Sequence, residues 1–213
     1  MIAKKLKTLT LSSEKENIEA FVNKITASQI CQGISYLFFL NPKGRYISDA
    51  FYIKKNEEHI FAGSENSINN LKNWLNFLNF KKTMKIEEPD YNAYISLEKE
   101  SEDFFEDPRG LGYINLSKEE KAINAEKKYE DLRIKNEIAE FDDFEHEKSI
   151  ILEYGKISKF ISTEKGCYPG QELMNRTRTQ GSVRKTVLKT TSSDNAIKVL
   201  SQNEKGFLVF KRI

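Results

Sequence analysis

Residues 34–55 read ISYLFFLNPKGRYISDAFYIKK, and this stretch sets the architecture that the rest of the sequence indicates. Two runs rich in aromatic and aliphatic residues flank the tetrapeptide NPKG, in which Pro42 presets one turn angle and Gly44 frees another. The stretch therefore predicts two antiparallel strands joined by a tight turn.

Short strands and amphipathic helices continue on either side of this predicted hairpin. Residues 3–13 alternate apolar and polar side chains like a strand, and Ser13 with Glu16 forms a capping box that predicts a helix over 17–25. A helical stripe marks 67–80. Further strands are expected over three segments: 57–63, 83–88 and 91–98. Because the connections are short, hairpins are favoured over crossovers, and we expect an α+β fold with an antiparallel sheet.

The chain changes in character near residue 100, and we expect three regions in all. An N-terminal α+β region over 1–100 is followed by a middle α+β region over 101–182, which opens with the acidic, turn-rich sequence SEDFFEDPRGLGY. Within the middle region, residues 117–136 predict a charged helix that Ser117 caps. Residues 183–213 are expected to form a short β-module of three strands.

The composition is that of a folded protein without a dominant charge. Thirty-four basic and 32 acidic residues give a formal net charge of +2, too balanced for a protein that coats nucleic acid over its whole surface. No apolar run approaches the ~18 residues of a membrane span, and the N-terminus resembles neither a signal nor a transit peptide. We therefore expect a cytoplasmic protein that does not bind membranes and whose two cysteines stay reduced.

One of the two cysteines lies in the polar loop EKGCYPGQE, residues 164–172. A small buried hydrophobe is the usual role of a free cysteine. Here Gly166 and Gly170 permit close approach of another group, which makes Cys167 a candidate reactive thiol. Basic residues nearby in sequence favour the thiolate if they converge in space: Lys159, Lys165, Arg176 and Arg178. Cys31, at the start of an apolar strand, is expected to be buried and less reactive.

Two further features suit either ligand binding or an ordinary solvated surface. Residues 173–189 hold five positive charges and no acid, and Arg176 and Arg178 share one face if the segment is extended. A phosphate, a polyglutamate tail or an RNA backbone fits such a surface equally well. Asp49 is an acid on an otherwise apolar strand, where it either faces outward or pairs with a ligand.

The loop KGCYPGQE (165–172) resembles the signature of the YgfZ family, folate-binding proteins described as tRNA-modifying or iron–sulfur cluster assembly factors. Further segments follow the order of that family: 37–53, 107–112, 129–140 and 181–188. The family shares its fold with the glycine cleavage T-protein, so the resemblance implies antiparallel sheets and flanking helices around a central cavity that holds folate. Because 41 residues follow Glu172, the C-terminal β-barrel module is expected to be abbreviated.

The resemblance also implies which residues serve the function. Cys167 would be the functional thiol, with Lys165 beside it. No firm metal site is expected, because an iron–sulfur cluster needs about four cysteine ligands and Cys167 would at most ligate iron transiently. Tetrahydrofolate would lie between the cysteine loop and the strand of Asp49. The residues expected to contact it are Asp49, Gly166, Tyr168, Gly170, Gln171, Glu172 and Arg176.

Three functions stay open on the sequence. The first is a folate-binding accessory factor for assembly or repair of [4Fe–4S] proteins, which supports tRNA modification indirectly and has iron–sulfur client or assembly proteins as partners. The second is a tetrahydrofolate-dependent aminomethyltransferase. The T-protein, however, has Lys-Gly-Asp-Phe-x-Gly in place of this cysteine loop, and Lys135 stands where it has a folate-contacting carboxylate. The third is a tRNA-binding module that uses 176–189 for weak, salt-sensitive contacts.

Overall fold

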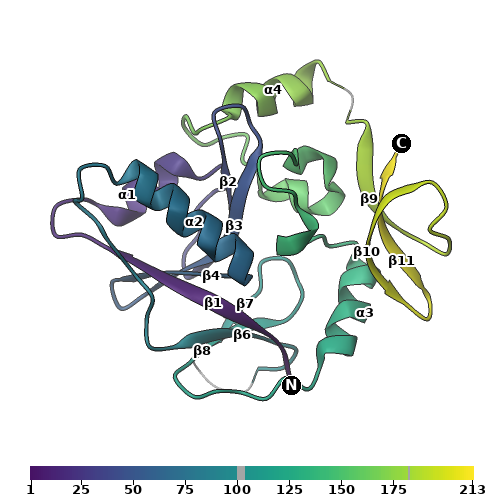
Figure 1. Ribbon diagram of the computed structural model, residues 1–213, viewed down its shortest axis with the longest axis horizontal. Coiled ribbons are helices and arrows are strands. Elements are labelled where there is room, and N and C mark those ends of the chain that lie inside the picture. The colour runs from purple at the N-terminus through teal and green to yellow at the C-terminus, as the bar shows by residue number, and fades with distance from the viewer. Residues whose placement is uncertain (100–103, 182) are drawn as a thin grey trace.

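A computed structural model describes residues 1–99, 104–181 and 183–213 of the chain. Its main element is a curled antiparallel sheet in the order β2-β3-β4-β1-β6-β8-β7, with β5 also paired to β1 (Figure 1). The strands are β1 (Ile2–Ser12), β2 (Ile34–Leu40), β3 (Tyr46–Lys55), β4 (Glu58–Gly63), β5 (Lys85–Glu87), β6 (Asn92–Ser96), β7 (Phe104–Glu106) and β8 (Tyr113–Ser117). A mixed fold with an antiparallel sheet is thus confirmed.

The hairpin predicted from residues 34–55 forms as β2 and β3, which pair from Ile34↔Ile53 to Leu40↔Tyr46. Its turn closes through Asn41, whose backbone N–H donates to the carbonyl of Arg45 at 2.9 Å. Gly44 adopts a positive φ of 66° in this turn. The local sequence therefore specifies both strands and the turn that reverses the chain.

The large sheet is buried on both faces. On one face lie α1 (Ile18–Ile25) and α2 (Glu65–Leu78), which bury the apolar stripes that the sequence predicts. The middle of the chain covers the opposite face. Side chains of β2 alternate between the two cores, with Phe38 on one side and Phe39 on the other, as the two-residue period of a strand requires. Burying each such side chain contributes about 1.5–3 kcal/mol.

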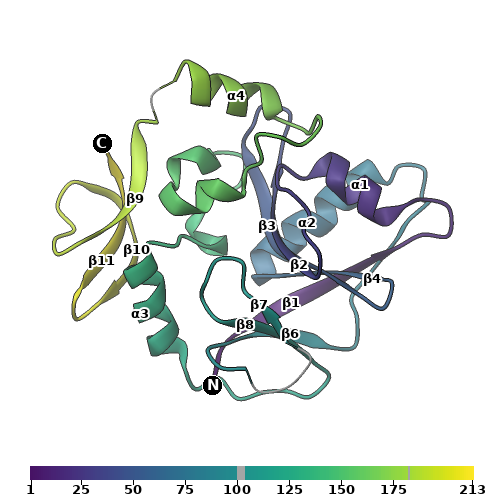
Figure 2. The ribbon, with the colours of Figure 1, turned by 180° about the vertical axis from the view of Figure 1, so that it is seen from behind.

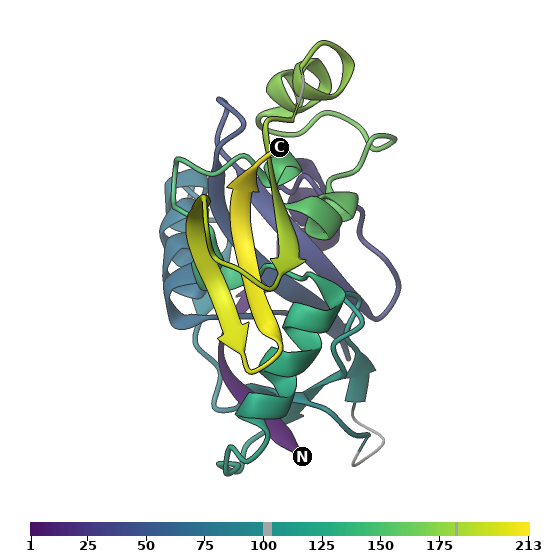
Figure 3. The same cartoon turned by 90° about the vertical axis from the view of Figure 1, so that its right-hand side faces the viewer.

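The middle region does not stand apart from the first region, because its strands β7 and β8 belong to the large sheet. The segment that follows them packs between the large sheet and a separate C-terminal sheet (Figures 1 and 2). This segment contains α3 (Glu126–Asn136) and the 3₁₀ helices η1 (Phe141–Asp143), η2 (Ile151–Glu153) and η3 (Gly155–Phe160), and α4 (Gln171–Thr179) follows it at the end of the β2–β3 hairpin. The C-terminal sheet has the order β10-β11-β9 and lies beside α3 (Figure 3). Its strands are β9 (Lys185–Thr190), β10 (Ala196–Asn203) and β11 (Gly206–Arg212), as the sequence predicts.

Three local predictions are wrong. The cap of α1 is Asn17, whose side chain accepts from the N–H of Ala20, whereas Ser13 only closes the preceding turn. The helix expected over 117–136 begins at Glu126, because Ser117 is still paired within β8. The segment 173–189 is not one strand: its first part belongs to α4, and only its last residues form β9.

In the described part of the chain, no helix combines the length and the apolar character that a membrane crossing requires.

The two turns singled out from the sequence meet backbone to backbone. Gly170, in the cysteine loop, has φ +82°, and a Cβ at this position would lie 2.6 Å from the Cα of Gly44 and 2.7 Å from the carbonyl oxygen of Asn41. Gly170 is therefore required both by its backbone angle and by the lack of space. The contact fixes the cysteine loop against the end of the β2–β3 hairpin.

We predict that Gly170→Ala lowers the free energy of unfolding by about 2–4 kcal/mol, because it adds αL strain to overpacking. Gly166→Ala is the matched control in the same loop, since a Cβ there meets nothing within 4 Å. The control should change stability by less than about 0.5 kcal/mol. Urea denaturation of both variants measures the difference, and equal stabilities would contradict the close packing of the two turns.

Candidate functional site

The cysteine loop is anchored by Lys165, whose ammonium lies at the C-terminal end of α1. Its Nζ donates to the carbonyl oxygens of Asn23, Thr26 and Ser28 at 2.5, 2.6 and 3.2 Å. Carbonyls at a helix C-terminus favour a cation. Burial lowers the pKa of Lys165 to about 8, so the ammonium form still dominates at neutral pH. The described contacts thus give Lys165 a structural role in fixing the loop.

Cys167 follows this anchor and is exposed to solvent. Within the described residues, no cation forms a hydrogen bond or ion pair with its sulfur; Arg178 instead donates to the carbonyl of Ile161 at 2.7 Å. Arg176 and Arg178 lie on α4, so the prediction that they share a strand face is wrong: residues two apart on a helix point in different directions.

The other predicted contacts in this loop divide between core and surface. Tyr168 and Gly170 are buried in the protein, and the Tyr168 ring lies 5.6 Å from Lys165 Nζ. Gly166 is exposed, and so is Glu172 in the first turn of α4, where Gln171 is half-buried. Arg176 is exposed on the same helix. The loop is thus a fixed surface feature, and its part in folate binding stays a prediction.

Asp49 lies in the middle of β3 and is fully buried. Three hydroxyl groups donate to its carboxylate: Tyr36, Tyr46 at 2.5 Å and Ser67 at 2.8 Å. Burial raises the pKa of Asp49, while the hydrogen bonds from the hydroxyls oppose the rise. The carboxylate therefore neither faces outward nor presents a free oxygen to a ligand in this structure.

A hollow of 290 Å³ opens directly beside this cluster. Two of the three hydroxyl donors, Tyr46 and Ser67, form part of its wall. We name it the aromatic hollow, and its full lining is Tyr46, Asn66, Ser67, Asn70, Phe141, Asp142, Phe144 and His146. Asp142 accepts from Ser64 and Asn66 at 3.1 and 3.3 Å. Asn70 forms no side-chain hydrogen bond among the described residues, so its amide is available to a ligand.

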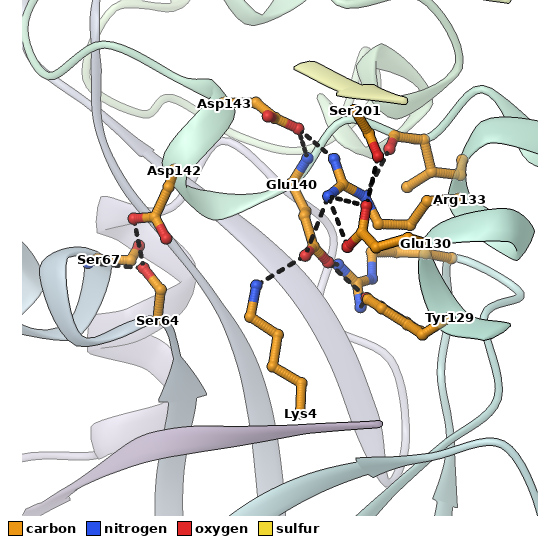
Figure 4. A network of polar contacts seen from close by, with 12 residues as sticks. Lys4, Ser64, Ser67, Tyr129, Glu130, Arg133, Glu140, Asp142, Asp143 and Ser201 are labelled. Atoms are coloured by element: carbon orange, nitrogen blue, oxygen red, sulfur yellow. Dashed lines mark hydrogen bonds and ion pairs between the residues drawn. The ribbon is translucent and has the colours of Figure 1, made fainter. Parts of the chain in front are cut away.

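A buried ionic network, part of which Figure 4 shows, packs against Phe141 in the lining of this hollow. At its centre is Arg109, whose guanidinium is fully buried, donates to both oxygens of Asp107 and donates to Glu140 at 3.0 Å. The cation also lies 4.6 Å from the ring centre of Phe51 and 5.3 Å from that of Phe141. The turn 107–112, which the sequence marks as turn-rich, thus places a fully buried cation at the centre of this network.

Glu140 joins this network to three other segments of the chain. It accepts from Lys4 on β1 at 2.8 Å and from Tyr129 at 2.5 Å, and lies 3.6 Å from Arg133 on α3 (Figure 4). Burial by itself would raise the pKa of Glu140, but Arg133, Lys4 and Arg109 outweigh it and hold the pKa well below its usual range. The carboxylate is therefore charged at all ordinary pH values.

The structure does not bring all predicted site residues together. Neither Asp49 nor Cys167 lines the aromatic hollow or four other hollows on the described surface. The prediction that Cys31 is buried is wrong: β2 begins only at Ile34, and the preceding loop leaves Cys31 exposed. The sequence did not point to Asn70 or Phe144. Asn70 is one of several asparagines on α2, and Phe144 is one of many aromatic residues, so neither stands out before the fold is known.

No cluster of three or more His, Cys, Asp or Glu side chains in the described residues is placed to hold a metal ion.

The comparisons agree with the fold. No family model matches the chain, and no curated protein matches it in sequence. Among solved structures, the chain is similar to aminomethyltransferase T of the glycine cleavage system from Bartonella henselae, with a TM-score of 0.68 and 9% identity, over 98% of this chain and 76% of that chain. The chain has the fold of this aminomethyltransferase. At 9% identity the likeness establishes the fold alone.

We predict that Glu140→Gln lowers the free energy of unfolding by about 3 kcal/mol at pH 7, because it leaves buried cations without their counter-charge. The folded pKa of Glu140 is depressed, so its contribution is complete above the unfolded value of 4.5 and is lost as the pH falls below it. The difference between wild type and variant should therefore shrink by up to about 2 kcal/mol at pH 3.

Urea denaturation at the two pH values measures this change. Glu119→Gln is the control, since it removes an exposed carboxylate that has no side-chain partner among the described residues. A difference between wild type and Glu140→Gln that stays the same at pH 7 and pH 3 would show that Glu140 does not act through its charge.

Proposed function

We propose that this protein binds a tetrahydrofolate-type ligand through the aromatic hollow. The observation that carries the proposal is the position of this hollow: its wall is made by the residues that hold the buried carboxylate of Asp49, on a strand where the sequence predicts folate contacts. The fold agrees, because a similar structure is that of an aminomethyltransferase. Membership of the YgfZ family, on the residues of the cysteine loop, is part of this proposal.

The lining of the hollow fits a flat, polar heterocycle such as a pterin ring. Phe141 and Phe144 offer aromatic surfaces for stacking. Asn66 and Asn70 carry both donors and acceptors, and Asp142 accepts from amino and ring N–H groups. The volume of 290 Å³ lies at the lower end of ligand pockets, so it suits the ring system and leaves the tail of the ligand outside.

His146 adds a further polar group to the lining of the aromatic hollow. Its Nδ1 lies 2.9 Å from the carbonyl oxygen of Ile47, an acceptor, so Nδ1 carries the proton in the neutral ring. Nε2 is then an acceptor for a ligand donor. Asp49 acts behind the wall: its carboxylate holds the hydroxyls of Tyr46 and Ser67 in place and is a positioning residue rather than a direct contact.

The role in [4Fe–4S] assembly or repair rests on the exposed thiol of Cys167. Lys165 and Gly170 fix its loop on both sides, so the sulfur is presented at a constant place on the surface. A single thiol can ligate iron only together with a partner's ligands, or exchange with a partner's sulfur. The proposed partner is therefore an iron–sulfur client or assembly protein.

We predict that tetrahydrofolate binds saturably and that Asn70→Ala weakens it about tenfold, through the loss of one or two hydrogen bonds. Asn73→Ala is the control, because Asn73 is exposed on the same helix but does not line the hollow. Alanine suits both helix positions, so the fold should persist. Calorimetry measures the binding. The fluorescence of Trp74 gives a second readout, because Trp74 is the single tryptophan and lies one helical turn from Asn70. Absence of saturation at millimolar ligand would overturn the proposal.

We predict that Cys167→Ser fails to support [4Fe–4S] enzymes in a strain that lacks this protein, whereas Cys31→Ser restores them. Serine keeps nearly the same volume but removes a soft ligand and nucleophile. Both thiols are exposed, so the pair controls for accessibility. The activity of a [4Fe–4S] enzyme in extracts is the measurement. Full restoration by Cys167→Ser would show that the thiol has no functional role.

A further inference from the structure

A second hollow, of 780 Å³, lies between the segment 145–154 and the C-terminal sheet. We call it the basic hollow, because six of the side chains that line it are cationic. They are Arg45, Lys148, Arg184, Lys185, Lys198 and Arg212. Only two lining side chains are acidic, Glu145 and Glu153. An excess of one charge around a concave surface concentrates the field there.

Both acids are already paired. Glu145 lies 3.4 Å from Lys148, and Glu153 lies 3.5 Å from Lys185. The side chains of Arg184 and Arg212 form neither an ion pair nor a hydrogen bond in the described part of the chain. Two guanidinium groups therefore line this hollow without a carboxylate side chain as partner in the described residues. A guanidinium is the side chain best suited to bind carboxylate or phosphate.

The strand register places two cationic side chains opposite one another, and only Lys185 has an acidic partner among the described residues. Arg212 on β11 stands directly opposite Lys185 on β9, so two positive side chains share one face of the sheet. Like charges in this position destabilise a sheet. The rings of Tyr154 and Phe210, stacked at 4.6 Å, form an apolar floor beneath them. A bound anion would relieve the repulsion above this floor.

The basic hollow and the aromatic hollow share a wall. Phe144 and His146 line the aromatic hollow, whereas Glu145 between them lines the basic hollow. The ring of Phe144 packs edge-on against Tyr154 at 4.8 Å, which joins the two linings. A ligand bound in the aromatic hollow therefore has the basic hollow as its neighbour.

We propose that the basic hollow binds a short flexible chain of anionic groups, the γ-linked polyglutamate tail of the folate whose ring occupies the aromatic hollow. The assignment to a folate tail rests on the proposed function; the assignment to a multivalent anion does not. Each further glutamate adds one carboxylate. Four basic side chains of the hollow can meet these carboxylates, because they have no carboxylate partner among the described residues: Arg45, Arg184, Lys198 and Arg212.

The test compares tetrahydrofolate with one and with five glutamates by calorimetry at about physiological salt, where weak surface attraction is screened. The pentaglutamate should bind about tenfold tighter than the monoglutamate, because its additional carboxylates form a few partly exposed ion pairs with the basic hollow. The double variant Arg184→Ala/Arg212→Ala should reduce this preference to within about twofold and leave the affinity for the monoglutamate unchanged.

The matched control is Lys81→Ala/Lys82→Ala, which removes the same charge from exposed positions that line neither hollow. It should keep the preference. Equal affinities for the two folates in the wild type, or a preference that survives in the arginine variant, would overturn the proposal.

Free penta-γ-glutamate and tripolyphosphate separate this inference from the proposed function. If the monoglutamate does not bind but free pentaglutamate binds the wild type and not the arginine variant, the anion site is established and the folate ring site fails. Tighter binding of tripolyphosphate than of pentaglutamate would overturn the carboxylate assignment in favour of phosphates. Binding of tRNA at this salt, lost in the arginine variant, would overturn it in favour of a nucleic acid.

Discussion

The fold depends on one buried cation. The guanidinium of Arg109 has no solvent exposure, and its charge is balanced by Asp107 in its own turn and by Glu140 from the middle region. Removing one partner of such a buried charge is strongly destabilising, because the remaining charges are no longer balanced. Lys4, Arg109 and Arg133 all reach Glu140, so this one carboxylate links the first strand, the β7–β8 turn and α3.

This network also determines where a ligand can bind. Arg109 lies against the rings of Tyr36, Phe51 and Phe141, so the centre of the sheet is filled by protein side chains. Phe141 also lines the aromatic hollow, which therefore lies at the edge of this cluster. Asp49 bridges the two through the hydroxyls of Tyr36 and Tyr46. The same contacts that stabilise the fold thus shape the proposed folate site.

The sequence predicted the features that depend on interactions between residues close together in the chain. The β2–β3 hairpin follows from strand periodicity and one Pro-x-Gly turn, and the stripes of α1 and α2 from helical spacing. It did not predict the partners of Arg109, because Asp107 is two residues away but Glu140 is 31 away and is brought near only by packing. Arg176 was misplaced for a related reason: the αL angle of Gly170 starts a helix where composition alone suggested a strand. Cys31 was assigned to β2 because a strand boundary is set by pairing, which single residues do not reveal.

The hollow beside the Asp49 cluster is the proposed site of a folate ring. A crystal structure of the protein soaked with tetrahydrofolate is the decisive experiment. We expect electron density for a bicyclic ring between Phe144 and Asn70, with the hydroxyls of Tyr46 and Ser67 still bonded to Asp49. Density for the ring at another place in the protein, with the aromatic hollow empty, would contradict it.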